Sequence, residues 1–177
     1  AAFLVSSLAF AAPKNPKAPL TLAVQSDKSR VDFIGSKAAD FHTGTFTVKG
    51  GSVQVEGGKL VGGSFVIDLA NLKVTDAAGE RLAGHLKSAD FFDVAKFGEA
   101  TYTISSVDYS SATACTINGT LNIKGVGVPV SFASNIRSAS EKGLFGQAFF
   151  SLDRTLLGIA YAGPSKDVQI AVHLFAK

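Results

Sequence analysis

Short runs in which apolar and polar residues alternate recur along the chain from Thr21 onward. In one of them, Cys115, Ile117, Leu121 and Ile123 are separated by polar or small residues. A period of two places every second side chain on the same face of an extended strand. Each of these runs therefore predicts a β-strand with one buried face.

Three glycine pairs separate the first of these runs. They lie at residues 50–51, 57–58 and 62–63, and such pairs between alternating runs are typical of β-hairpin turns. About eight strands at this short spacing predict an all-β fold. The pattern fits an antiparallel β-barrel or sandwich, in which the apolar faces of the strands are buried against one another.

One stretch breaks the strand pattern. Residues 85–97, HLKSADFFDVAKF, place Phe91, Phe92 and Phe97 among charged side chains. Apolar and charged residues interleave here as they do on a short amphipathic helix. We expect a helical insertion near residues 85–93 that acts as a lid or plug on a closed sheet. The alternative is that these phenylalanines only fill the core.

The composition fits one folded domain at residues 21–177. Of the 177 residues, 46% are apolar, which is enough to bury a substantial core. The net charge is +3, and two of the positive charges belong to Lys14 and Lys17. The rest is nearly neutral, so we expect no nucleic-acid partner. Cys115 is the single cysteine, which excludes an intramolecular disulfide and predicts a small buried strand residue.

The first twenty residues fit a secretion signal followed by a linker. Residues 1–12, AAFLVSSLAFAA, form an apolar run of signal-peptide length that ends in an A-x-A cleavage signature. The run is too short to span a bilayer as a helix. Residues 13–20 contain three prolines, which predict an extended linker. The chain has no Met, so we expect its natural start to precede these residues. We therefore expect a periplasmic or secreted protein whose mature domain has no stable membrane insertion.

Residues that could support catalysis or bind a metal are sparse. His42, His85 and His173 lack the short spacing of a metal site. The residues around Ser64 do not form the G-x-S-x-G turn of a hydrolase nucleophile. We predict no catalytic residue, no metal and no cofactor.

The charged pair Asp153-Arg154 follows an apolar strand. An arginine at the mouth of a barrel could donate hydrogen bonds to the polar head of a ligand. The alternative is a structural ion pair with a residue elsewhere in the chain.

Several of these segments, in this order, resemble the YceI family. The block HLKS-x-DFFD is the most specific of them, together with the G-x-L-x-x-x-G turn that follows it. Where the family often has Tyr-Pro after this block, the chain has Phe97-Gly98. The resemblance covers residues 24–176 and rests on FVIDL at 65–69, HLKSADFFDV at 85–94, NGTLNIKG at 118–125, VPV at 128–130, DR at 153–154 and LGI at 157–159.

The resemblance implies a fold and a function. The fold is a lipocalin-like, extended antiparallel β-barrel with a short helical insertion. The implied function is that of a bacterial periplasmic carrier, not an enzyme. Members look like proteins that hold a polyisoprenoid, an isoprenoid quinone or a fatty-acid derivative in the barrel cavity.

Our leading hypothesis is thus a periplasmic carrier that sequesters a long-chain amphiphilic lipid in an apolar barrel. The alternatives are a filled barrel that acts as a structural or interaction module without a ligand and, with less support, a lipid-modifying enzyme. An unpaired strand edge would also permit a homodimer. Strand alternation and the 85–97 segment give the following ligand-binding candidates: Phe33, Phe46, Phe65, Ile67, Phe91, Phe92, Phe97, Tyr102, Phe132, Phe150, Arg154 and Ile170.

Overall fold

The computed structural model describes residues 18–177. The predicted signal segment and most of the predicted linker lie outside this range, while Leu20, the last linker residue, already begins the first strand. The described chain contains β1 (Leu20–Ala23), β2 (Arg30–Lys37), β3 (Asp40–Glu56), β4 (Lys59–Val74), α1 (Gly79–Lys87), β5 (Glu99–Tyr109), β6 (Ala114–Ile123), β7 (Val126–Ser140), β8 (Gly143–Asp153), the 3-10 helix η1 (Arg154–Leu157) and β9 (Asp167–Ala176).

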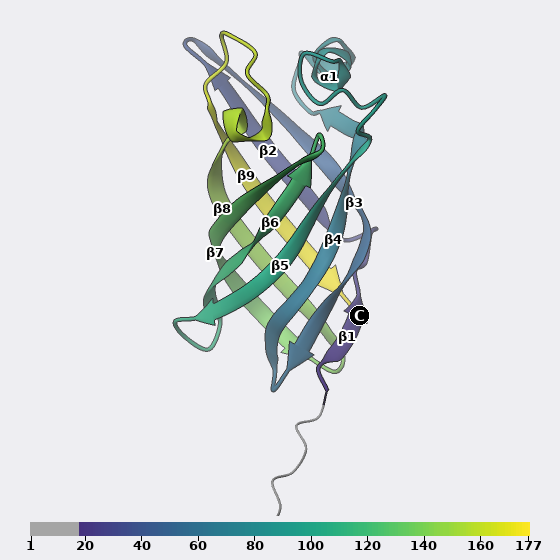
Figure 1. Ribbon diagram of the computed structural model, residues 1–177, viewed down its shortest axis with the longest axis vertical. Helices are drawn as coiled ribbons and strands as arrows, with labels where there is room; N and C mark the ends of the chain where they lie inside the picture. Colours follow the sequence, from purple (N-terminus) through teal and green to yellow (C-terminus); the bar gives the residue numbers. More distant parts are fainter. Residues whose placement is uncertain (1–17) are drawn as a thin grey trace, which may run out of the picture.

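Eight of these strands close into an antiparallel β-barrel (Figure 1). From β4 to β9 each strand pairs with the next one along the chain, β9 pairs with β2, and β2 pairs with β3. The long β3–β4 hairpin closes the ring, since β3 pairs with β2 on one side and with β4 on the other. β1 is an extra strand against the far end of β3. The predicted all-β, lipocalin-like barrel with a short helical insertion is confirmed.

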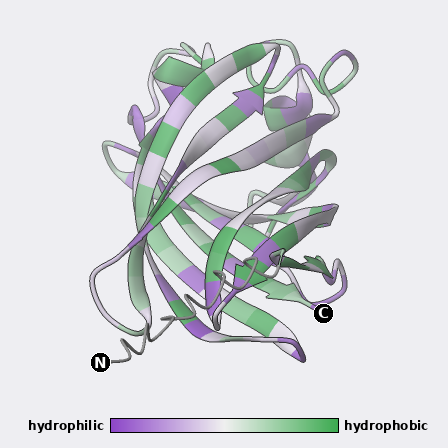
Figure 2. Cartoon of the chain, turned by 60° about the horizontal axis from the view of Figure 1, so that its bottom comes forward, coloured by the Kyte–Doolittle hydropathy of each residue, from purple (hydrophilic) through white to green (hydrophobic). Residues whose placement is uncertain are grey.

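The alternation in the sequence decides which face of each strand lines the interior. In β6, Cys115, Ile117, Leu121 and Ile123 are buried, whereas Asn122 between the last two is exposed. The same banding of apolar and polar residues runs along the other strands (Figure 2). Cys115 is a buried free cysteine, as predicted, and burial raises the pKa of its thiol.

Only one of the three glycine pairs makes the predicted hairpin turn. Gly57 and Gly58 connect β3 to β4, whereas the other two pairs lie inside those strands. Gly51 and Gly63 have φ angles of 134° and 138°. A Cβ on Gly63 would lie 2.5 Å from the carbonyl oxygen of Ser52 on the paired strand. These glycines therefore allow the paired strands β3 and β4 to approach closely and bend, in place of the turns predicted there.

The helix lies earlier in the chain than predicted. α1 spans Gly79–Lys87 and overlaps the expected 85–93 insertion only in its last turn. The side chain of Asp76 accepts a hydrogen bond from the backbone N–H of Ala78 just before the helix. Ser88 ends the helix in an extended conformation, with its hydroxyl donating to the carbonyl of His85. No helix within residues 18–177 is long and apolar enough to cross a membrane.

Four connections gather at one end of the barrel, which we call the helical end. They are the β2–β3 hairpin, the β4–β5 connection that carries α1, the short β6–β7 turn, and the β8–β9 connection that begins with η1 (Figure 1). Backbone hydrogen bonds hold the turns after α1 together, among them Phe92 N–H to the carbonyl of Leu86 at 3.1 Å. The helical end is thus covered by irregular segments, while the walls below it are strands.

Gly119 of β6 leaves room for the side chain of Tyr102, which extends from β5 past β6 to the carbonyl of Val130 in β7. A Cβ at this position would lie 2.6 Å from Oη of Tyr102. We expect Gly119→Ala to lower the free energy of unfolding by about 1–3 kcal/mol through overpacking. Denaturant unfolding would measure this loss. Gly35→Ala in β2 is the matched control, since a Cβ there meets nothing within 4 Å. Equal losses in both variants would contradict the steric explanation.

Candidate functional site

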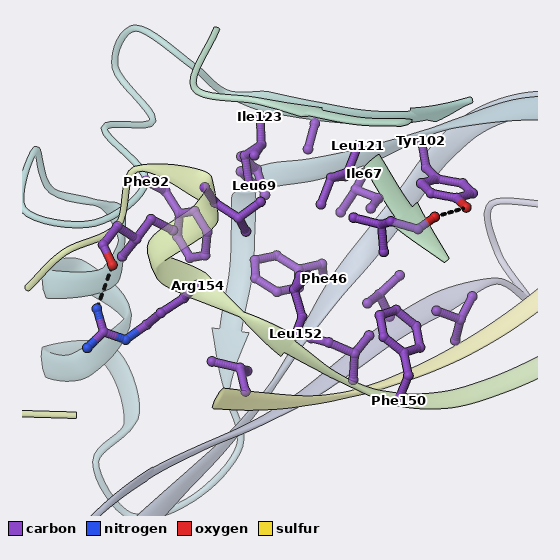
Figure 3. A pocket seen from close by; sticks show the side chains of 18 of the residues that line it. Phe46, Ile67, Leu69, Phe92, Tyr102, Leu121, Ile123, Phe150, Leu152 and Arg154 are labelled. Atoms are coloured by element: carbon purple, nitrogen blue, oxygen red, sulfur yellow. Dashed lines mark hydrogen bonds between the residues drawn. The ribbon is translucent and has the colours of Figure 1, made fainter. Parts of the chain in front are cut away.

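An apolar cavity of about 120 Å³ lies inside the barrel, below the helical end (Figure 3). We call it the inner cavity. Nine of the predicted ligand-binding residues line it: Phe46, Phe65, Ile67, Phe92, Tyr102, Phe132, Phe150, Arg154 and Ile170. Eleven further residues complete the wall, most of them aliphatic: Val31, Leu69, Ala100, Leu121, Ile123, Val130, Leu152, Leu157, Ile159, Val168 and Val172.

Four aromatic rings form the floor of the inner cavity. Tyr102 lies between Phe65 and Phe132, with ring centroids 5.7 and 5.4 Å away, and Phe132 stacks on Phe150 at 4.4 Å. Below these rings the barrel is nearly filled, with a gap of only about 30 Å³. The aromatic floor therefore separates a packed core from a half of the barrel that is not filled.

The wall of the inner cavity presents almost no free polar atom. The Tyr102 hydroxyl donates to the backbone carbonyl of Val130 at 2.8 Å. Burial raises the pKa of Tyr102 to about 12, so the phenol stays neutral at physiological pH. Within residues 18–177, every buried side-chain nitrogen or oxygen has a hydrogen-bond partner. A surface of this kind favours apolar ligands, because a polar group placed there would lose its hydrogen bonds to water.

A second cavity of about 140 Å³ lies between the β2–β3 hairpin, α1 and the β8–β9 connection. We call it the outer cavity. Phe33 and Phe91, two further predicted residues, line it with Leu82 and Leu86 of α1. Its lining also includes Ser36, Lys37, His42 and Ser165, although the surface that faces the cavity is almost wholly apolar. Both cavities are therefore apolar, and polar side chains occur mainly among the residues of the outer one.

Arg154 is a structural residue of the β8–β9 connection. Its side chain is buried and donates four hydrogen bonds to backbone carbonyls, those of Ile159, Tyr161, Pro164 and Ser165, at 2.6–2.9 Å. Its neighbour in the sequence, Asp153, pairs with Lys166 at 3.2 Å. The guanidinium therefore does not form the ion pair considered as the alternative, and four of its N–H donors bond to backbone carbonyls. Its side chain nevertheless lines both cavities.

Three aromatic rings connect α1 and the turns after it to the β8–β9 connection. His85 of α1 lies edge-on to Phe91 and to Tyr161, at centroid distances of 5.1 and 5.0 Å. Phe91 and Tyr161 lie 4.9 Å apart. Since Arg154 fixes the carbonyl of Tyr161, the β8–β9 connection and the α1 segment are held against each other.

The side chain in the lining of the outer cavity that could act as a catalytic base is that of His42. His42 Nδ1 lies 3.3 Å from Oδ2 of Asp76, and the same oxygen accepts the backbone N–H of Thr43. The backbone N–H groups of Ala78 and Thr43 hold the pKa of Asp76 below its usual range. The described contacts bring no hydroxyl or thiol to His42, so this pair serves to join β3 to the start of α1. Within residues 18–177, no three potential metal ligands cluster.

Phe97 is the one predicted residue that lies outside both cavities. A Cβ on Gly125 would contact its ring at 3.7 Å, so Phe97 packs toward the β6–β7 turn. Sequence reasoning missed the residues that irregular segments contribute, such as Leu82, Ile159 and Pro164. No periodicity marks these positions, and only the LGI segment after Arg154 hinted at an apolar contribution. Ligand binding by the candidate residues stays a prediction.

The fold and the site together define a lipocalin-like barrel, in which closed antiparallel strands surround an apolar cavity. The YceI-like domain family matches residues 22–176. The chain therefore belongs to the YceI family, as the sequence resemblance predicted. No curated protein matches the chain.

Solved structures support the fold. Burkholderia cenocepacia BcnA is similar with a TM-score of 0.74 at 19% identity, over 87% of this chain and 99% of that chain. A polyisoprenoid binding domain from Saccharophagus degradans, implicated in plant cell wall breakdown, has a TM-score of 0.72 at 17% identity, over 88% and 97%. The Campylobacter jejuni YCEI protein has a TM-score of 0.55 at 14% identity, over 99% and 92%.

The neutral phenol of Tyr102 in the cavity floor predicts that the free energy of unfolding depends on pH. Unfolded tyrosine loses its proton near pH 10, whereas folded Tyr102 keeps it until about pH 12. Between these values the folded state binds more protons than the unfolded state, so stability falls as the pH rises. Spectrophotometric titration should show a tyrosinate component near pH 12 that disappears in Tyr102→Phe. Its persistence in that variant would contradict the assignment.

The carbonyl bonds of Arg154 predict that lysine cannot replace it. A lysine ammonium cannot span four carbonyls, so some of them would be left without a donor. We expect Arg154→Lys to lower the free energy of unfolding by about 1–3 kcal/mol. Amide hydrogen exchange should show lost protection in residues 154–166 before the barrel strands are affected. An unchanged exchange pattern would show that these bonds do not hold the connection.

Proposed function

We propose that the protein is a periplasmic carrier that sequesters a long-chain amphiphilic lipid in its barrel. The ligand class is a polyisoprenoid, an isoprenoid quinone or a fatty-acid derivative. The observation that carries this proposal is the inner cavity, whose wall is apolar and whose two polar side chains, Tyr102 and Arg154, donate to backbone carbonyls.

The physical basis is the transfer of an apolar chain from water to a dry site. Each buried CH₂ stabilises the complex by roughly 0.8 kcal/mol before the costs of association. The inner cavity holds the tail of the ligand. The polar head lies toward the outer cavity, whose surface is also apolar but whose lining residues include Ser36, Lys37 and His42. A charged head at the aromatic floor would be desolvated without a partner.

The comparisons support the ligand class by analogy. The S. degradans domain of the same fold is named as a polyisoprenoid binding domain. At 17% identity that likeness establishes the fold alone, so the ligand comes to this chain as a proposal. The apolar wall of the inner cavity is the independent support.

Both alternatives have less support. A filled interaction module would have side chains where the inner and outer cavities lie. An enzyme would need a nucleophile in contact with a base, and His42 contacts Asp76 through a carboxylate oxygen that also accepts the N–H of Thr43. We therefore propose a binding protein and not an enzyme. The periplasmic location is proposed from the signal-like sequence of residues 1–12.

Native mass spectrometry of the protein recovered from its host's periplasm tests this function. We expect an extra mass that organic extraction removes and that fragmentation assigns to an isoprenoid or acyl lipid. An apo mass, together with failure to load a polyprenyl and quinone mixture, would contradict the carrier proposal. Absence of the protein from the periplasmic fraction would contradict the proposed location.

A polar substitution in the inner cavity should abolish loading. Ile67 lines this cavity from β4, and Ile67→Asn would place an amide without partners on the apolar wall. We expect at least a tenfold loss of bound lipid, roughly the effect of one unpaired polar group. Ile34→Asn is the matched control, since Ile34 lies on the outer face of β2 with 38% exposure. Equal loading of the two variants would place the lipid elsewhere.

A further inference from the structure

The inner and outer cavities meet at a small set of shared residues. Phe46, Phe92, Arg154, Ile159 and Val168 line both of them. At this junction the rings of Phe46 and Phe92 meet edge to face, with centroids 5.6 Å apart (Figure 3). These two rings lie at the boundary that the two cavities share, so an apolar chain that occupied both would pass beside them.

Most of the junction cannot move without disturbing the barrel. Phe46 belongs to β3, is 7% exposed and packs against Phe33 at 5.2 Å. Arg154 is held by its four carbonyl bonds, one of which goes to Ile159. Val168 belongs to β9, where it pairs with Gly35 of β2. The Phe46 ring is therefore held by burial and packing, the Arg154 side chain by its hydrogen bonds, and the backbone of Val168 by strand pairing.

Phe92 differs from the others because it lies outside every strand and helix and is also only partly buried, whereas Ile159, which lies outside them too, is 2% exposed. Phe92 lies in the turns between α1 and β5. Its N–H bonds to the carbonyl of Leu86, and the next residue, Asp93, has a left-handed φ of 48°. The position of the Phe92 ring thus depends on a local turn, and the ring can rotate without breaking a strand pairing.

We propose that Phe92 determines the chain length of the bound lipid, as a movable partition between the inner and outer cavities. This inference rests on the proposed lipid binding and names the residue that selects among ligands of one class. A short apolar chain fits in one cavity and leaves the ring in place. A longer chain must pass the Phe46–Phe92 contact, so it binds only when the ring turns away.

The test uses prenyl alcohols that share a head group and differ in length: geraniol, farnesol and geranylgeraniol. Displacement of a fluorescent lipid probe gives their affinities for the wild type and for Phe92→Ala. We expect the affinity for geranylgeraniol to rise about tenfold, because more of its chain is buried once the cavities join. The affinity for geraniol, the shortest of the three, should change by less than about twofold, since it gains least from the joined cavities. Phe92→Trp should act in the opposite direction and weaken geranylgeraniol selectively.

Phe97→Ala is the matched control. It removes the same ring from the same turns after α1, but Phe97 lines neither cavity. We expect this variant to leave the preference for chain length unchanged. A similar gain for geranylgeraniol in Phe97→Ala would overturn the proposal, because loosening of the helical end would then explain it. A parallel change for all three alcohols in Phe92→Ala would overturn it as well.

The outcomes separate this inference from the proposed function. Binding of the alcohols with no length-dependent effect of Phe92 would refute the partition and leave the carrier proposal standing. Failure of the wild type and of every variant to bind any of the alcohols, or the lipids extracted from the host, would refute both. Circular dichroism of each variant shows whether the barrel is intact, and Phe92→Leu provides a milder change that should give an intermediate gain.

Discussion

The rest of the structure depends on the closure of the barrel through β3 and β4. β3 pairs with β2 near its start, with β1 near its end and with β4 along most of its length. Closure leaves the eight barrel strands without a free edge, so their backbone groups are paired and their inward side chains must share one enclosed space. At one end large side chains fill that space. At the helical end they do not, and the two cavities are the result.

The polar groups near this space are satisfied before any ligand arrives. The Tyr102 hydroxyl and four of the five N–H donors of Arg154 donate to backbone carbonyls, so most donors near the cavities already have partners. In the proposed carrier, the inner cavity would therefore select mainly by shape and length, since apolar contacts carry little directional information. Recognition of a head group would fall to polar residues in the lining of the outer cavity, such as Lys37 and His42.

The sequence predicted the barrel well and its lid less well, for a physical reason. Alternation with a period of two identified inward residues such as Phe65, Ile67 and Phe132, because a strand converts sequence parity into a face. It could not distinguish Gly57-Gly58, which form a turn, from Gly62-Gly63, which lie inside β4 where the paired strand β3 approaches closely. That difference depends on the paired strand and not on local sequence.

The turns after α1 follow no period, so the residues there could be assigned only by type. Phe91 and Phe92 do line a cavity, whereas Phe97 packs toward the β6–β7 turn. The helix itself carries an i,i+4 pair, Leu82 and Leu86, that lines the outer cavity, but the predicted insertion began too late to include Leu82. The DFFD residues that looked helical form the turns after the helix.

The division between strands and irregular segments bears on how such a barrel could take up a lipid. The backbone of a wall residue such as Phe46 can move only if the pairing of β3 with β2 is disturbed, and its buried ring is 7% exposed. Residues 88–97 take part in no strand pairing. They are held by local turns, by the ring contacts of Phe91 and by the hydrogen bond from Lys124 to the Phe91 carbonyl. In the proposed partition, a lipid that passes between the cavities would therefore meet its least costly path at Phe92. A partition made of one ring on a turn would let the contents of the barrel change while its walls stay closed.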